Sequence, residues 1–309
     1  IGLKNFEGLE AGAFRNFGNL ELLAKQVVEG FIVGKHKSPF HGFSVEFAEH
    51  RLYNPGESTK NVDWKVFART DRMFTKRFEE ETNLRCQLVI DISSSMNFPL
   101  NTFNKLQFSS LAAVSLMYLL QKQRDAFGLT IFDDEIRVNT PCKSSSTHFR
   151  ILLSQLEHYI HELSLNRKTS TASVLHVIAE KIHRRSLIII FSDMFGNVED
   201  SEEIFKALRH LKHNKHEVIL FHVTDESREM NFEFENRPYL FIDMESGEEL
   251  KLQSNQVKEF YQKRVKDYID GIKLKCLQFG IDFIPADINS GFDGMLQSYL
   301  VKRSKMRIS

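Results

Sequence analysis

The chain has little cysteine, no net charge and no long apolar segment, and each shortage excludes a class of protein. Its three cysteines (Cys86, Cys142 and Cys276) form no Cys-x-x-Cys pair, so neither a zinc site nor a disulfide framework is expected. Cys86 and Cys276 lie in apolar segments and are expected in the core. No apolar run approaches the roughly 20 residues that cross a bilayer, so membrane insertion is not expected.

The charge balance argues against a nucleic-acid partner. Over 309 residues, 41 Lys and Arg balance 41 Asp and Glu, so the formal net charge is zero. Proteins that bind nucleic acids usually carry a basic excess, which this chain lacks. Its first ten residues are polar and acidic, unlike a signal peptide, and we therefore expect a cytoplasmic protein.

Strands and helices alternate from residue 85 onward. Short apolar runs predict buried strands, and helical spacing of apolar residues predicts the segments between them. The strands are expected at 86–91, 127–132, 186–193, 217–223 and 281–284, and the helices at 104–123, 147–163, 171–183, 200–213, 254–279 and 292–302. A shorter strand at 136–139 is expected to form a hairpin with 127–132. The alternation predicts an α/β fold with a doubly wound, mostly parallel sheet.

Two segments depart from this alternation. Residues 1–84 are predicted to hold an N-terminal helix, near 19–31, and a β-rich extension of short strands and loops. Alternating runs at 64–67 and 73–78 support the strands. Within the second predicted domain, 85–309, alternating aromatic residues around a Ser-Gly turn predict a β-hairpin inserted at about 229–252.

The residues that carry chemistry follow the two predicted strands that end in an acid. In a doubly wound sheet, ligands bind beyond the carboxyl ends of the strands, where the strand order reverses. Asp91 is followed by Ser93 and Ser95, and a turn can aim these alternating side chains into one cavity. Thr169, just before a predicted helix, adds a hydroxyl, and Asp193 completes the set. Hard oxygen ligands suit Mg²⁺, and Mn²⁺ or Ca²⁺ fit them as well.

This pattern of Asp-x-Ser-x-Ser, a later Thr and a strand-end Asp resembles the metal-ion-dependent adhesion site (MIDAS) of von Willebrand factor A domains. The chain also contains the motifs Asp63-Trp-Lys65 and Ala68-Arg-Thr70. These motifs most specifically carry a resemblance, from about residue 20 to 303, to the bacterial domain-of-unknown-function family 58. It implies a von Willebrand factor A or Rossmann-like fold, with metal ligation by Asp91, Ser93, Ser95, Thr169 and Asp193.

The third loop of the site departs from the family's pattern. The family usually has Gly before the Thr, whereas this chain has Arg167-Lys168. These bulkier, cationic residues could oppose metal binding or help to recruit an acidic ligand. Thr171 is hard to separate from Thr169, although the spacing to Leu175 favours Thr169.

The resemblance also implies a function. It indicates work alongside MoxR-type AAA+ ATPases in chaperone-like assembly or maturation of other proteins. We therefore expect a non-enzymatic binding module, without catalytic residues or an organic cofactor, in which an acidic residue of a protein partner completes the metal shell.

Two other functions stay open. A Mg²⁺-dependent phosphatase needs a second Asp two residues after the first, where this chain has Ser93, and a phosphate-binding glycine loop is missing. The other alternative is a structural module with an empty metal site.

Two further groups of potential ligands have simpler explanations. Asp133 and Asp134 follow a strand, and we expect them to form a hairpin turn. Four histidines (His183, His210, His213 and His216) have imperfect helical spacing and no accompanying Cys or carboxylate set, so solvated helix faces are expected.

Overall fold

The computed structural model describes residues 20–34, 49–52, 62, 64–77, 84–100, 102–161, 171–183, 185–194, 201–242 and 249–306. Contacts along the chain separate a large unit, residues 1–34 and 84–309, from a small unit, residues 35–83. The large unit contains the central sheet and the helices that cover it.

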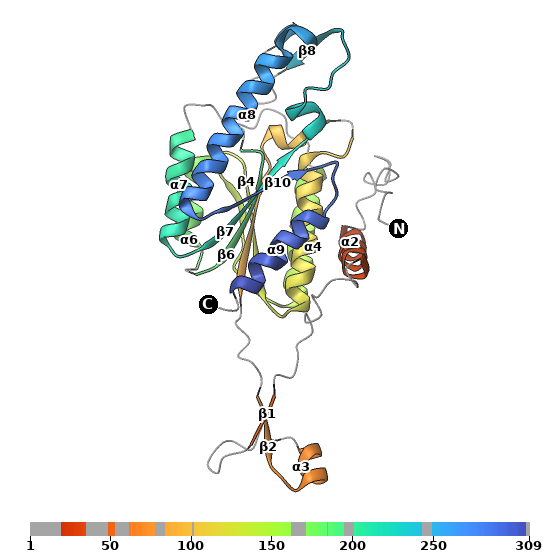
Figure 1. Ribbon diagram of the computed structural model, residues 1–309, viewed down its shortest axis with the longest axis vertical. Coiled ribbons are helices and arrows are strands. Elements are labelled where there is room, and N and C mark those ends of the chain that lie inside the picture. The colour runs from red at the N-terminus through yellow and green to blue at the C-terminus, as the bar shows by residue number, and fades with distance from the viewer. Residues whose placement is uncertain are drawn as a thin grey trace. The chain divides into compact units, whose positions relative to one another are not determined.

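The centre of the large unit is a six-stranded sheet with the strand order β10-β7-β6-β3-β4-β5 (Figure 1). Its strands are β3 (Arg85–Asp91), β4 (Ala126–Phe132), β5 (Ile136–Asn139), β6 (Leu187–Ser192), β7 (Glu217–Thr224) and β10 (Asp282–Asp287). All neighbours are parallel except β5, which pairs antiparallel with β4. Strand β6 is buried along its whole length, because helices cover both faces of the sheet. The predicted α/β class and doubly wound, mostly parallel sheet are confirmed.

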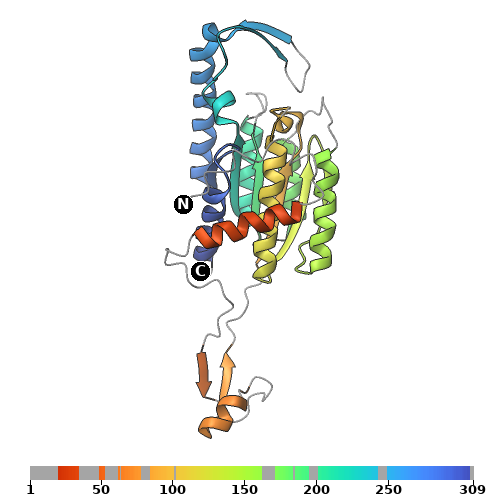
Figure 2. The same cartoon turned by 90° about the vertical axis from the view of Figure 1, so that its right-hand side faces the viewer.

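Helices lie on both faces of this sheet (Figures 1 and 2). On one face, α4 (Lys105–Lys122), α5 (Ser146–His161) and α9 (Asp293–Met306) share a core with Leu88 and Ile90 of β3. On the other, α6 (Thr171–Lys181), α7 (Ser201–His213) and α8 (Ser254–Phe279) share a core with Val89. Successive strand residues point to opposite faces, so one strand serves both cores. None of the described helices is long and apolar enough to cross a membrane.

Helix α2 (Leu20–Gly34) packs against α4 and belongs to the large unit. Its buried residues Leu20, Ala24, Val28 and Phe31 form one stripe that joins the core of α4. The sequence grouped this helix with the extension at 1–84, whereas the structure divides the chain at 34/35 and at 83/84. An amphipathic helix needs a partner for its apolar stripe, and α4 provides it.

In the described part of the small unit, the chain forms two strands and one short helix. Strand β1 (Glu49–Leu52) pairs antiparallel with β2 (Phe74–Arg77), which confirms a strand in the alternating run at 73–78. The run at 64–67 lies instead in helix α3 (Trp64–Thr70), so that strand prediction was wrong. Four residues are too few to separate a period of two from one of 3.6. The edge-to-face contact of Trp64 with Phe67 uses the i,i+3 spacing of a helix.

The insertion is a hairpin of β8 (Pro238–Ile242) and β9 (Glu249–Gln253), paired antiparallel. The hairpin is therefore confirmed, but it spans 238–253 and not 229–252. A single π-helical turn, η4 (Glu226–Met230), occupies the start of the predicted segment. Phe232 packs against Phe241 and Tyr261, which ties the hairpin to α8. Both views place the hairpin beyond the carboxyl ends of the parallel strands (Figures 1 and 2).

Candidate metal centre

The strand order of the sheet reverses at β3. From β3 the chain crosses through α4 to β4 on one side, while β6 and β7 lie on the other side. Asp91 is the last residue of β3, and Asp193 directly follows β6. Each of these two aspartates is only 1% exposed. They occupy the position where open α/β sheets bind ligands.

The turn after Asp91 brings the two predicted serine hydroxyls together. One carboxylate oxygen of Asp91 accepts a hydrogen bond of 2.9 Å from the backbone N–H of Ser93, which fixes the turn. The other oxygen accepts one of 2.7 Å from the hydroxyl of Ser192. The Ser93 and Ser95 hydroxyl oxygens are 3.1 Å apart, as the alternating spacing predicts. The 3-10 helix η2 (Ser94–Asn97) begins within this turn.

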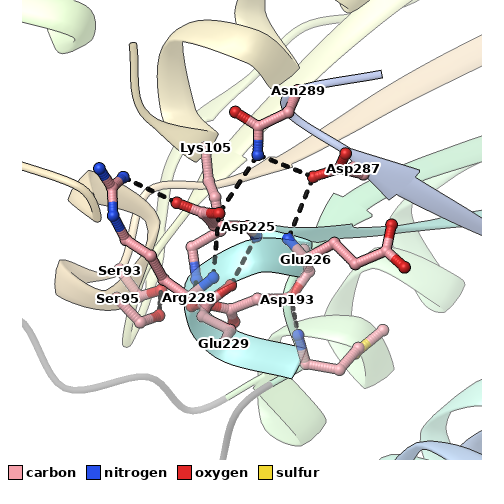
Figure 3. Close-up of polar contacts among 12 residues, drawn as sticks. Ser93, Ser95, Lys105, Asp193, Asp225, Glu226, Arg228, Glu229, Asp287 and Asn289 are labelled. Carbon is pink, nitrogen blue, oxygen red and sulfur yellow. Dashed lines mark hydrogen bonds and ion pairs between the residues drawn. The ribbon is translucent and has the colours of Figure 1, made fainter. Parts of the chain in front are cut away.

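Asp193 is paired with a lysine that the sequence analysis missed. The Nζ atom of Lys105 lies 2.7 Å from Oδ2 of Asp193 and 2.6 Å from Oε1 of Glu229, and the lysine is fully buried (Figure 3). Lys105 is the first residue of α4, directly after the N-cap Asn104. The only signal in the sequence was a cation in the first turn of a helix, where the helix dipole disfavours it.

Glu229 connects the site to the end of β7. Its second oxygen, Oε2, accepts a hydrogen bond of 2.8 Å from the backbone N–H of Asp225. Asp225 in turn is paired with Arg228, at 2.9 Å, and accepts a bond of 3.2 Å from Asn289 (Figure 3). Turn η4 is thereby fixed between the site and the segment that follows β10.

Burial sets the protonation of Asp91. Burial, followed by the nearby Asp193 carboxylate, raises the pKa of Asp91 to about 7, and the hydrogen bonds from Ser192 and Ser93 only partly oppose this shift. The ionised form of Asp91 is therefore costly without a nearby cation.

The pKa values of the groups around Asp193 are also shifted from their ordinary values. Burial lowers the pKa of Lys105, but Asp193 and Glu229 outweigh it and raise that pKa above its ordinary value, so the ammonium keeps its proton. Burial raises the pKa of Glu229. Burial also lowers the pKa of His222, on β7, to about 4, so this imidazole is neutral at pH 7.

Thr169, with Arg167 and Lys168 before it, lies outside the described residues, and its place as a ligand stays a prediction. The backbone of Thr171 begins α6, but its side chain is likewise outside the description. The structure therefore brings together Asp91, Ser93 and Ser95 near Asp193, and leaves the third loop untested.

The donor set fits a hard divalent cation. Two carboxylates and two hydroxyls offer oxygen atoms, and the costly negative charge of Asp91 would be relieved by a cation. The hydrogen bonds to Asp91 leave each of its oxygens a second lone pair. Across the described part of the chain, no three His, Cys, Asp or Glu side chains gather as a metal-binding group. Among the described residues, a metal here would therefore draw on hydroxyl ligands as well as on the two acids.

The two other groups of potential ligands differ in their exposure: Asp133 and His216 are buried, whereas His183 and His213 are exposed, as expected for solvated faces. Asp133 lies in the β4–β5 turn, as predicted, and its two oxygens are 2.8 and 2.9 Å from Nε of Arg137. His216 is buried and accepts a hydrogen bond from the backbone N–H of Ser186, so the expectation of a solvated face was wrong for it. His210 is half-buried and lies 3.2 Å from His176.

Comparison with known proteins gives the family. The family model described as "Protein of unknown function DUF58" matches residues 49–269, and the chain belongs to this family. Uncharacterized proteins of Mycobacterium tuberculosis (Rv1480) and Mycobacterium bovis (Mb1516) are 25% identical over 206 residues. The match covers 67% of this chain and 63% of each relative, so it spans less than two thirds of their length.

The solved structures that match this chain have low sequence identity to it. BatB from Bacteroides thetaiotaomicron has a TM-score of 0.47 and 14% identity, covering 73% of this chain and 100% of BatB. An aerotolerance-related membrane protein from Bacteroides fragilis has a TM-score of 0.40 and 14% identity, covering 71% and 97%. The SpRpn10 VWA domain has a TM-score of 0.31 and 14% identity, covering 46% and 76%. The fold described above rests on the sheet topology itself.

Proposed function

We propose that this chain is a non-enzymatic, metal-dependent protein-binding module. The observation that carries the proposal is that Asp91, Ser93 and Ser95 meet near Asp193 where the strand order reverses. Thr169 is the proposed fifth ligand. A bound Mg²⁺, or Mn²⁺ or Ca²⁺ in its place, would supply an electrophilic position for an oxygen atom of the partner.

The surroundings of the site suit an acidic partner. Lys105 offsets the charge of Asp193, so the site carries less negative charge than its acids alone would give. Ser93 is buried, whereas Ser95 is only half-buried, so solvent approaches from the side of Ser95. An Asp or Glu of a partner could enter on that side, with little repulsion from Asp193.

The family resemblance supports a MoxR-type AAA+ ATPase as a partner, with chaperone-like assembly or maturation of other proteins as the process. A module that holds a client through one metal-dependent contact can release it when the geometry of that contact changes. An ATPase that acts on the module or on its client could drive such a release.

The phosphatase alternative gains no support from Lys105. A lysine that stabilises a transferring phosphoryl group must face the substrate. The Lys105 ammonium is fully buried and lies between two carboxylates. The position two residues after Asp91, where a general acid is needed, is Ser93, which does not titrate near neutral pH.

Isothermal titration with Mg²⁺ tests the metal dependence. We expect saturable binding by the parent chain and none by Asp91→Ala or Ser93→Ala. Asp134→Asn is a matched control, because Asp134 lies at the same edge of the sheet but outside the site. A parent chain without saturable binding would contradict the proposal and favour the structural module with an empty site. Metal-dependent hydrolysis of a phosphate ester, lost in Asp91→Asn, would favour the phosphatase.

A binding assay tests the partner. We expect the parent chain to capture the MoxR-type ATPase of its own organism, or that ATPase's client, in Mg²⁺ and not in EDTA. Asp91→Ala and Asp193→Ala should lose this capture while Asp134→Asn keeps it. Equal capture with and without EDTA would show that the contact does not use the metal.

A further inference from the structure

Lys105, Asp193 and Glu229 form an ion-paired cluster at the site. Metal binding by Asp193 does not by itself explain why a lysine is buried beside it. Its ammonium lies 2.7 Å from one carboxylate and 2.6 Å from the other, and none of the lysine is exposed. A buried cation loses its hydration, and its place in the first turn of α4 opposes the helix dipole. The lysine is therefore held there by the two carboxylates and not by the local preference of the helix.

The cluster changes the charge that a divalent cation would meet. Oδ2 of Asp193 faces the ammonium at 2.7 Å, so this oxygen is not freely available to a metal. The ammonium is shared, because Glu229 approaches it equally closely. Removal of Glu229's charge would strengthen the pairing of the ammonium with Asp193, whereas removal of the ammonium would release Oδ2 of Asp193 from this ion pair.

We infer that Lys105 and Glu229 are positioning residues that set the affinity of the centre for its cation: Lys105 competes with the cation for Asp193, and Glu229 weakens that competition by sharing the ammonium. The inference rests on the proposed function, because the cation is the one that Asp91, Ser93 and Ser95 are proposed to bind. Because Asp193 is ion-paired with Lys105, it neutralises less of the cation's positive charge. The cation therefore attracts a partner's carboxylate more strongly.

The two residues should shift the affinity in opposite directions. Lys105→Met removes a positive charge close to the cation and breaks the ion pair that holds Oδ2 of Asp193, so we expect Mg²⁺ to bind at least about tenfold more tightly. Glu229→Gln keeps the shape and an oxygen acceptor but removes a negative charge, so we expect binding about three- to tenfold weaker. A cluster that only supports the fold would weaken binding in both variants.

A matched control lies at the opposite edge of the sheet. Lys302 is also held between two carboxylates, 2.7 Å from Glu217 and 3.0 Å from Asp282, at the amino ends of β7 and β10. Lys302→Met and Glu217→Gln make the same charge changes far from the site. We expect both to leave the Mg²⁺ affinity within about twofold of the parent, because screening by salt and solvent weakens the effect of distant charges.

Titration of the folded chain with Mg²⁺ alone, with folding verified by circular dichroism, tests the inference. Opposite shifts for Lys105→Met and Glu229→Gln uphold it, and shifts of one sign, or none, overturn it. If Lys105→Met does not fold, Lys105→Gln, which also removes the ammonium, takes its place. Tighter Mg²⁺ binding by that variant upholds the inference, and weaker or unchanged binding overturns it. A parent chain that does not bind Mg²⁺ overturns the proposed function. If the parent chain does not bind Mg²⁺ but Lys105→Met does, the inference that Lys105 competes with the cation is upheld. If neither chain binds Mg²⁺, both the proposed function and the inference are overturned.

Discussion

Asp91 and Asp133 lie at the ends of neighbouring parallel strands, on the same edge of the sheet, and their environments are opposite. Asp91 ends β3, and Asp133 follows β4 one step further along the edge. Both are buried. Asp133 is held by the Arg137 guanidinium at 2.8 Å, whereas the partners of Asp91 are the backbone N–H of Ser93 and the hydroxyl of Ser192.

Because their partners differ, the pKa values of the two acids shift in opposite directions. Burial alone would raise the pKa of Asp133, but the bonds from Arg137 lower it below its ordinary value. Burial and Asp193 raise the pKa of Asp91 to about 7. Asp133, with its own arginine, is a structural part of a turn, whereas the charge of Asp91, which faces a second acid, would be relieved by a cation. The position on the sheet edge alone does not decide which of these an acid becomes.

The largest expected effect concerns metal affinity. Asp91→Asn removes a charged ligand, and we expect Mg²⁺ to bind about a hundredfold more weakly or not at all. Asp133→Asn should change the affinity less than about threefold, because Arg137 and its turn lie outside the site. Isothermal titration of the two variants side by side measures both. Similar losses would show that the two acids do not differ as described.

The next effect is on the stability of the metal-free chain. Asp91 has a folded pKa of about 7 against an ordinary value of 3.8, so between these values the folded state keeps a proton that the unfolded state has lost. Stability from this group is therefore lost as the pH rises through that range. Asp91→Asn cannot ionise, and we expect it to be about 2–4 kcal/mol more stable than the parent at pH 8 in EDTA.

Urea unfolding at pH 8 and at pH 4 measures this difference. The advantage of Asp91→Asn should shrink at pH 4, where Asp91 is protonated in the folded parent. Saturating Mg²⁺ at pH 8 should stabilise the parent and not the variant. An advantage that is the same at both pH values would contradict the assignment of the pKa to Asp91.

Asp133→Asn should act in the opposite direction. The lowered pKa of Asp133 means that its charge stabilises the fold above its unfolded pKa, and that this contribution is lost as the pH falls through the folded value. We expect the variant to be about 1–3 kcal/mol less stable at pH 7, because Arg137 loses its buried partner. Urea unfolding at pH 7 and pH 3 tests the sign, and the deficit should be smaller at pH 3.

The smallest effect is expected at Asp134. This acid is paired with Arg137 at 2.9 Å, but its side chain is 55% exposed. Solvent and salt screen such a pair, so we expect Asp134→Asn to change the unfolding free energy by less than about 0.5 kcal/mol. A deficit as large as that of Asp133→Asn would show that the whole turn, and not the buried acid, carries the stability.

Much of the fold could be predicted from periodicity. The helices at 104–123 and 254–279 and the strands at 86–91 and 127–132 lie within a residue or two of their positions in the structure. Long segments with a clear period or a buried apolar run are determined locally. The short run at 64–67 was wrong because four residues fit a strand and a helix equally well.

The candidate site could be predicted only in part. Spacing alone was enough to bring the hydroxyls of Ser93 and Ser95 together, because they belong to one turn. Lys105 and Glu229 come from a helix start and a π-helical turn that are 124 positions apart in the chain. The one local signal for Lys105 is its charge in the first turn of α4, and no local pattern marks Glu229 as part of the site.

The sequence by itself determined the order of strands and helices, the acid that ends β3 and the acid that follows β6, since apolar periodicity and strand-end position are properties of short segments. Only the tertiary structure decided which charges surround those acids. The Asp91 carboxylate lies near a second acid and hydroxyl groups, Asp133 pairs with an arginine, and Asp193 pairs with a buried lysine. The physical reason is that the charge of a buried carboxylate depends on groups a few ångströms away in space, whatever their distance along the chain.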